Sequence, residues 1–167
     1  MARKRNFTVG EHVVYPSHGV GRITDVETQE VAGYSLDVYV VSFDEDRMTL
    51  RIPVNKVDHL GLRTPSSSNI IDLAFEALTK KVKTKRGELW SRRAQEYEGK
   101  INSGDMVSIA EVIRDLYRGD GEPEQSYSER QIYQLAMGRL IQELAVIEDI
   151  NATQATQKVE MVLLDAA

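Results

Sequence analysis

The chain of 167 residues contains no cysteine, so it can form no disulfide and offers no thiolate for catalysis or metal binding. It also lacks any run of about 18 apolar residues, the length that a membrane-spanning helix requires. The basic residues at its start are not followed by the apolar core of a signal peptide. These absences lead us to expect a protein of the reducing cytoplasm.

Histidine is scarce as well, and no catalytic arrangement stands out. The chain has three histidines, none of which occurs in an HxH or HExxH spacing that would bind a metal. Gly19-Val20-Gly21 lacks the third glycine and the following helix of a phosphate-binding loop. We therefore expect a protein that is not an enzyme and has no cofactor and no metal site.

Charge is distributed unevenly. The formal net charge is −5, which argues weakly against nucleic-acid binding. Residues 79–93 nevertheless carry seven basic side chains against one acid, whereas residues 141–167 carry five acids against one lysine. Because salt confines the field of a charge to about 8 Å, a local basic segment can bind phosphates on an acidic protein.

The N-terminal part of the sequence has the pattern of short strands. β-Branched and aromatic residues gather in brief runs, and in the last run apolar side chains alternate with polar ones. Gly21 lies inside the second run and suggests a bend or bulge. Residues 1–62 are therefore expected to form a small β-barrel of Tudor or SH3 type. The runs cover residues 12–15, 20–30, 34–43 and 48–52.

The pattern changes after residues 63–69, a segment with three serines and one proline that we predict to be a linker. From residue 70 onward apolar side chains recur every three to four positions, as in amphipathic helices. Asp105 precedes one of these stretches as a candidate helix cap, and Ser126 or Ser128 is the candidate cap of a later, long one. Residues 70–167 are expected to form a compact domain of four or five helices, which makes the chain an α+β protein of two domains.

The most suggestive segment is Leu89-Trp90-Ser91-Arg92-Arg93, which holds the only tryptophan of the chain. Long cationic side chains bind phosphates without sequence preference, and an apolar ring beside them can wedge into a minor groove. The alternative is structural, since a tryptophan at a helix start often packs into a core and paired arginines often face solvent. The residues alone leave both interpretations open.

Proline marks two strand ends, at Tyr15-Pro16 and Ile52-Pro53. A strand that ends in this way is often an edge strand, and an exposed edge can pair with a strand of a partner. Val41, Arg51 and Pro53 are predicted to lie on or near such a surface. The alternative is that these residues only close the barrel.

Several motifs together resemble the CarD/CdnL family of bacterial transcription regulators. The opening motif FTVGEHVVYPSHGVG also resembles the module by which transcription-repair coupling factors bind RNA polymerase, but those factors lack the helical half. The resemblance runs in order from about residue 7 to residue 150. The motifs are residues 7–21, 50–56, 61–63, 90–93, 103–105 and 110–117.

The resemblance implies two binding sites. The Tudor-like domain of such proteins binds the β1 lobe of the RNA polymerase β subunit by strand pairing, which makes Val41, Arg51 and Pro53 the contact residues here. A basic residue that some relatives use after the second strand corresponds to Gln29, so that contact is not carried over. The helical domain of such proteins binds promoter DNA near the upstream edge of the melted bubble.

In that comparison Trp90 is the minor-groove wedge, and Arg92 and Arg93 hold phosphates. The implied function is stabilisation of the open promoter complex by a monomer that binds no membrane. Two alternatives remain from the residues: a nonspecific DNA-binding module, and a protein-interaction adaptor that acts without polymerase. The first alternative predicts DNA binding without any contribution from residues 1–62. The second predicts that Arg92 and Arg93 have no effect in any DNA-dependent assay.

Overall fold

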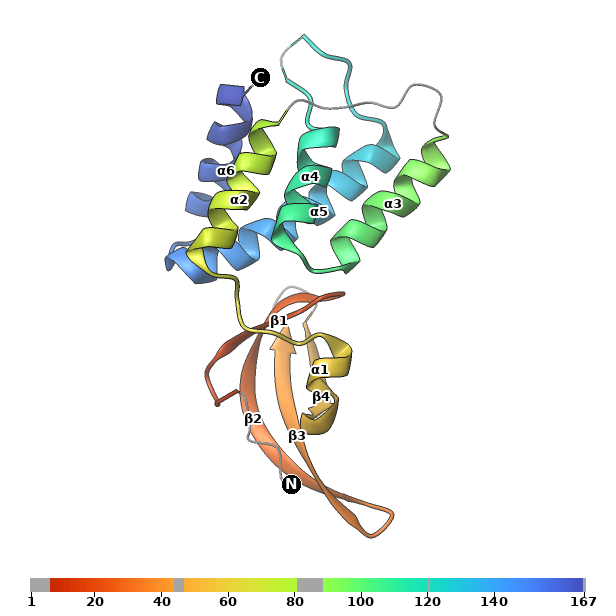
Figure 1. Cartoon of the computed structure of the whole chain (residues 1–167), viewed down its shortest axis with the longest axis vertical. Coiled ribbons are helices and arrows are strands. Elements are labelled where there is room, and N and C mark those ends of the chain that lie inside the picture. Colours follow the sequence, from red (N-terminus) through yellow and green to blue (C-terminus); the bar gives the residue numbers. More distant parts are fainter. Residues whose placement is uncertain (1–6, 44–46, 81–88, 120, 167) are drawn as a thin grey trace. The chain divides into compact units, whose positions relative to one another are not determined.

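The computed structural model describes residues 7–43, 47–80, 89–119 and 121–166. The chain divides into two compact units between Pro65 and Ser66, a β unit followed by a helical unit (Figure 1). Among the described residues, strands lie only in the β unit and the longer helices lie only in the helical unit. This confirms the predicted α+β class.

The β unit is a curled, four-stranded antiparallel sheet in the order β1-β2-β3-β4 (Figure 1). Its curl forms half of a barrel, and the predicted Tudor-like fold is confirmed. A short 3-10 helix, η1 (Val54–Lys56), and a single turn of helix, α1 (Val57–Leu60), follow the last strand. The strands are β1 (His12–Tyr15), β2 (Gly19–Val31), β3 (Tyr34–Phe43) and β4 (Met48–Pro53).

The core of the β unit follows from alternation along β3. Tyr39, Val41 and Phe43 share one face of the strand and are fully buried in one apolar cluster. Phe7 packs edge-on against Tyr39, with ring centroids 5.5 Å apart, and its backbone N–H donates to the Tyr39 hydroxyl at 3.2 Å. The N-terminal motif is thus tied to the central strand by both an apolar and a polar contact.

Strand β2 bends at a bulge, but not where the sequence suggested. The register with β3 shifts between Ile23 and Asp25, so the irregularity lies at Thr24 rather than at Gly21. Gly21 has a different role, because a Cβ atom there would lie 2.7 Å from Val41 Cγ1 and 2.8 Å from Phe43 Cε1. The glycine allows two core side chains to approach the backbone of β2.

We expect Gly21→Ala to destabilise the β unit by about 1–3 kcal/mol, because the added methyl group overpacks a core that has no room to move. Gly138 is the matched control: it lies within a helix, and a Cβ atom there would have no neighbour within 4 Å. Gly138→Ala should stabilise the helical unit by about 0.5–1 kcal/mol. Scanning calorimetry of the full chain measures both effects, and an unchanged β-unit transition in Gly21→Ala would contradict the packing argument.

The connection between the units is shorter than the predicted linker 63–69. Arg63 and Val14 exchange two backbone hydrogen bonds, at 2.7 and 3.0 Å, so Arg63 extends the sheet. At the other end, Ser68 already begins a helix, and the backbone N–H of Ser66 donates to the Glu143 carboxylate at 2.8 Å. Glu143 is the only buried charged residue among those described. Composition marked the segment but did not reveal these hydrogen bonds.

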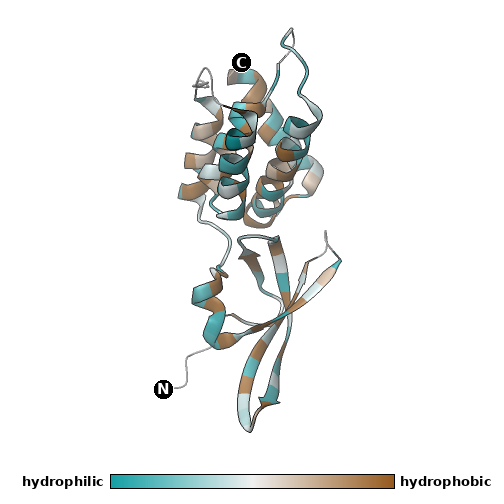
Figure 2. Cartoon of the chain, turned by 90° about the vertical axis from the view of Figure 1, so that its right-hand side faces the viewer, coloured by the Kyte–Doolittle hydropathy of each residue, from teal (hydrophilic) through white to brown (hydrophobic). Residues whose placement is uncertain are grey.

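The described residues of the helical unit form five helices, of which α4 is the most deeply buried. Asp105 caps α4 by accepting from the Ser108 backbone N–H at 3.0 Å, as predicted. Ser126 caps α5 in a reciprocal capping box with Glu129. Apolar residues lie on the inner faces of the helices (Figure 2). The helices are α2 (Ser68–Thr79), α3 (Trp90–Asn102), α4 (Met106–Leu116), α5 (Tyr127–Glu148) and α6 (Ala152–Ala166).

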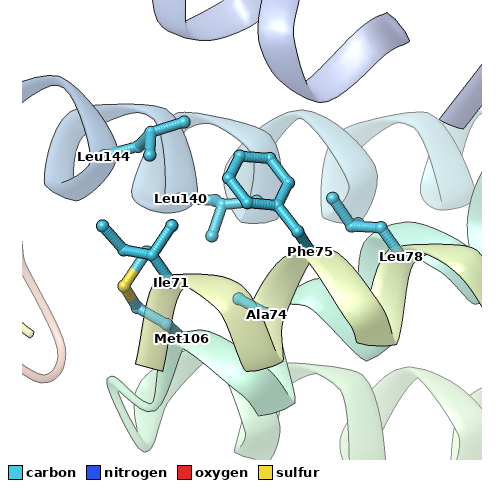
Figure 3. A pocket seen from close by; sticks show the side chains of 7 residues that line it. All are labelled: Ile71, Ala74, Phe75, Leu78, Met106, Leu140 and Leu144. Atoms are coloured by element: carbon cyan, nitrogen blue, oxygen red, sulfur yellow. The ribbon is translucent and has the colours of Figure 1, made fainter. Parts of the chain in front are cut away.

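A small hollow lies between α2, α4 and α5 (Figure 3). Every side chain that lines it is apolar, so it offers no polar group that could orient a ligand. We interpret it as a packing feature of the helical core. Its lining residues are Ile71, Ala74, Phe75, Leu78, Met106, Leu140 and Leu144.

Candidate functional sites

Trp90 is the first residue of α3, and the fold gives it a defined place there. The backbone carbonyl of Leu89 accepts from the N–H groups of Arg92 and Arg93, both at 3.1 Å, which closes the first turn. Arg93 and Tyr97 follow Trp90 by three and seven residues, so the three side chains share one face of the helix. The inner end of that face is buried at Tyr97, whereas Trp90 at the outer end is only half-buried.

The sequence left Trp90 either as a DNA wedge or as a core residue, and its half-buried state lies between these two alternatives. The indole packs against the edge of the helical core and meets the Tyr97 ring at a centroid distance of 6.2 Å and a tilt of 52°. Part of the ring nevertheless remains accessible at the N-terminal end of α3. Trp90 is therefore both supported by the core and available for contact.

Arg93 lies beside both of these aromatic rings, which also contact each other. Its guanidinium carbon is 5.6 Å from the centre of the Trp90 ring and 5.7 Å from that of Tyr97. It also donates a hydrogen bond of 3.1 Å to the Tyr97 hydroxyl, which raises the pKa of Arg93 further above its ordinary value. Arg93 is thus bound within the protein before any ligand arrives.

The Tyr97 hydroxyl completes a connection to α4 by donating to the Asp115 carboxylate at 3.4 Å. Burial raises the pKa of the Tyr97 phenol and likewise the pKa of the Asp115 carboxyl group. These hydrogen bonds form a series from Arg93 through Tyr97 to Asp115. Arg93 places a positive charge at one end of the series, and Asp115 places a negative charge at the other.

Arg92 differs from its neighbour. Its side chain is exposed and makes no hydrogen bond or ion pair with another residue in the described part of the chain. Nearby cations are paired instead, Lys100 with Glu111 at 3.1 Å and Arg118 with Glu129 at 2.8 Å. Arg92 is therefore the cation of α3 best placed to bind a phosphate. The basic side chains of residues 81–86 lie outside the described residues.

The predicted polymerase-binding surface falls on β4. This strand is the last in the sheet, and within the described ranges its outer edge has no strand partner. Arg51 is exposed, and Pro53 ends the strand. The Nε atom of Arg51 lies 3.3 Å from a Glu27 carboxylate oxygen, in an ion pair that crosses over β3. Arg51 is thus oriented on the outer face of the sheet.

Val41 is not part of that surface, contrary to the prediction. It lies on the central strand β3, where its neighbours are Ile23 on one side and Leu50 on the other. Its side chain is fully buried in the core. The β-branched and aromatic residues that predicted this strand did not show which of its faces points inward, and Val41 points inward.

Two family models match the chain, one for each unit. Residues 7–65 match the CarD-like/TRCF RID domain, and residues 74–160 match the C-terminal domain of CarD. A curated relative, "Putative transcription factor YdeB" of Bacillus subtilis (strain 168), is 30% identical over 148 residues, which cover 89% of this chain and 96% of the relative. The chain belongs to the CarD family.

Two solved structures of CarD-family N-terminal domains, both from Myxococcus xanthus, are also similar. The solution structure of the 72-residue N-terminal domain of CarD is 33% identical, with a TM-score of 0.32, and the match covers 38% of this chain and 84% of that one. The corresponding domain of CdnL is 38% identical, with a TM-score of 0.33, and the match covers 41% of this chain and 96% of that one.

Membership of the CarD family identifies a transcription regulator associated with RNA polymerase. The described residues contain no group of three or more histidine, aspartate or glutamate side chains that could hold a metal ion. Among the described helices, none is both long and apolar enough to cross a membrane.

Sequence reasoning missed three residues of these CarD-family sites: Glu27, Tyr97 and Asp115. Tyr97 could have been found, because it lies four residues after Arg93 on one helix. Glu27 and Asp115 could not, because each reaches its partner from another strand or helix, at distances along the chain of 24 and 18 residues.

Proposed function

We propose that this CarD-family protein binds the β1 lobe of the RNA polymerase β subunit through its β unit and promoter DNA through α3, and so stabilises the open complex. The observation that carries the proposal is the accessible indole of Trp90 beside the exposed cation Arg92 on an otherwise acidic protein. The lifetime of open promoter complexes, measured with and without the full chain, tests the function directly.

The polymerase contact would use the outer edge of β4. An unpaired edge offers backbone N–H and C=O groups that can pair with a strand of the partner. Arg51 is exposed beside that edge, and Pro53, which has no N–H, would mark where the pairing ends. Val41 enters this proposal only as a buried support on the neighbouring strand.

The DNA contact would use the N-terminal end of α3. The accessible part of the Trp90 ring is suited to lie against or between bases where the duplex is already distorted. Arg92 would bind a phosphate, and the guanidinium donors of Arg93 that Tyr97 does not occupy could bind another. These contacts read DNA shape rather than sequence.

Stabilisation of the open complex follows from linkage. A ligand shifts an equilibrium only by its difference in affinity for the two states. A wedge that fits distorted DNA better than regular duplex therefore favours the open complex. Anchoring on polymerase raises the local concentration of the weak DNA-binding surface, so a small cationic site can suffice.

We expect the isolated full chain to bind duplex DNA weakly, with little sequence preference and a strong salt dependence. Two phosphate contacts predict a slope of about −2 in a plot of log binding constant against log salt concentration. Arg92→Ala should reduce that slope by about one unit. Fluorescence anisotropy with labelled duplexes of two unrelated sequences measures both quantities. Tight, sequence-specific binding without polymerase would contradict the proposal.

A further inference from the structure

The contacts of α3 distinguish two adjacent arginines that look equivalent in the sequence. Arg92 is exposed, whereas Arg93 lies against the Trp90 and Tyr97 rings and donates a hydrogen bond to Tyr97. A guanidinium is planar and weakly hydrated, so it stacks on aromatic faces in a way that an ammonium does not. The arrangement uses the shape of Arg93 as well as its charge.

The hydrogen bonds around Tyr97 have a consistent direction. The hydroxyl accepts from Arg93 at 3.1 Å and uses its single proton to donate to Asp115 at 3.4 Å. Tyr97 itself is 6% exposed, and Ile101, one turn further along α3, is fully buried. The connection therefore runs from a fixed point in the core to the ring at the outer end of the helix.

We propose that Arg93, Tyr97 and Asp115 form a positioning relay that holds the Trp90 indole at the N-terminal end of α3. Arg93 is then a positioning residue that acts through Trp90, in addition to any phosphate it binds. The relay holds the ring in the free protein, and its importance for DNA rests on the proposed function.

A fixed ring matters because a wedge that is already oriented loses less conformational freedom on binding. Trp90 lies at the first position of α3, and its N-cap residue Leu89 makes no capping hydrogen bond through its side chain. The helix start alone therefore provides little restraint. Arg93 adds restraint to the core packing of the indole through its cation–π contact, while Tyr97 holds the guanidinium.

The test uses Trp90 itself, because it is the only tryptophan of the chain and its fluorescence reports on one ring. We would measure the bimolecular rate constant for acrylamide quenching, from fluorescence lifetimes, in the full chain without DNA. Arg93→Lys keeps the charge but loses the stacking plane, and Arg92→Lys is its matched control. Tyr97→Phe removes only the hydroxyl, and Tyr133→Phe on α5 is its control, a half-buried tyrosine on another helix.

Complete loss of the cation–π contact would raise the ratio of released to held indole about two- to fivefold, and Arg93→Lys, which keeps a cation without the planar group, should give part of that rise. We expect the quenching constant to rise in Arg93→Lys and, to a smaller extent, in Tyr97→Phe, and to stay unchanged in both controls. Circular dichroism establishes that every variant is folded. Unchanged quenching in folded Arg93→Lys, or an equal rise in Arg92→Lys, would overturn the relay.

Two further outcomes separate the parts of the inference. A rise confined to Arg93→Lys would remove Tyr97 and Asp115 from the relay. The same variants are then assayed for the lifetime of open promoter complexes. If the indole is released but the lifetime does not change, the relay stands and the proposed role of Trp90 on DNA fails.

Discussion

Trp90→Ala is expected to shorten the lifetime of open promoter complexes while leaving the affinity for RNA polymerase unchanged. The ring lies at the accessible end of α3, in the helical unit, whereas the proposed polymerase contact lies on β4. Stacking of one aromatic side chain on a base contributes about 1–3 kcal/mol, which corresponds to about a 5- to 150-fold change in stability of the complex. Dissociation kinetics of preformed complexes measure the effect.

Trp90→Phe is the matched variant, because it keeps a ring at the same position and should retain part of the effect. Trp90 also packs against the edge of the helical core, so the alanine variant must be shown to keep its helices by circular dichroism. An unfolded helical unit would mean that Trp90 acts mainly as a core residue. A folded variant with full open-complex lifetime would exclude the wedge.

Arg51→Glu is expected to abolish stable binding to the β1 lobe. Loss of one partner of a desolvated charge pair at an interface costs about 2–5 kcal/mol, so the affinity should fall at least about 30-fold. The substitution also places two carboxylates together, because Glu27 lies 3.3 Å from Arg51 in the free protein. Titration of the full chain against the isolated lobe, by calorimetry, gives the affinity.

Two controls separate the interface from the sheet. Arg22→Glu makes the same change of charge on β2, which lies on the opposite side of β3 from β4. It should leave the affinity for the lobe within about twofold, because exposed charges away from a contact contribute little. Arg51→Gln removes the positive charge without repelling Glu27 and should still weaken binding. Equal losses in Arg51→Glu and Arg22→Glu would indicate a general charge effect and contradict the edge contact.

The architecture could be predicted from the sequence because its signals are local. The change from a period of two to a period of 3.6, the cap at Asp105 and the serine-rich connection are all readable within a few residues. The placement of Arg51 on an exposed edge also followed from the proline that ends its strand.

What could not be predicted depends on contacts between elements. Val41 belongs to a strand pattern whose inward face is set by neighbours on β2 and β4. The need for glycine at position 21 arises from Val41 and Phe43, which lie 20 and more residues away. Arg92 and Arg93 are adjacent and chemically identical, and the positions of Trp90, Tyr97 and Asp115 give them different surroundings.

The ion pairs of Lys100 and Arg118 have a consequence for the distribution of the protein along a chromosome. A genome offers on the order of a million to a billion nonspecific sites, and a strongly cationic surface would be retained by them. Because Lys100 and Arg118 are paired with glutamates of the protein itself, these two cations add little free positive charge for such retention. The two ion pairs would therefore weaken retention at random sites and leave more of the choice of site to polymerase.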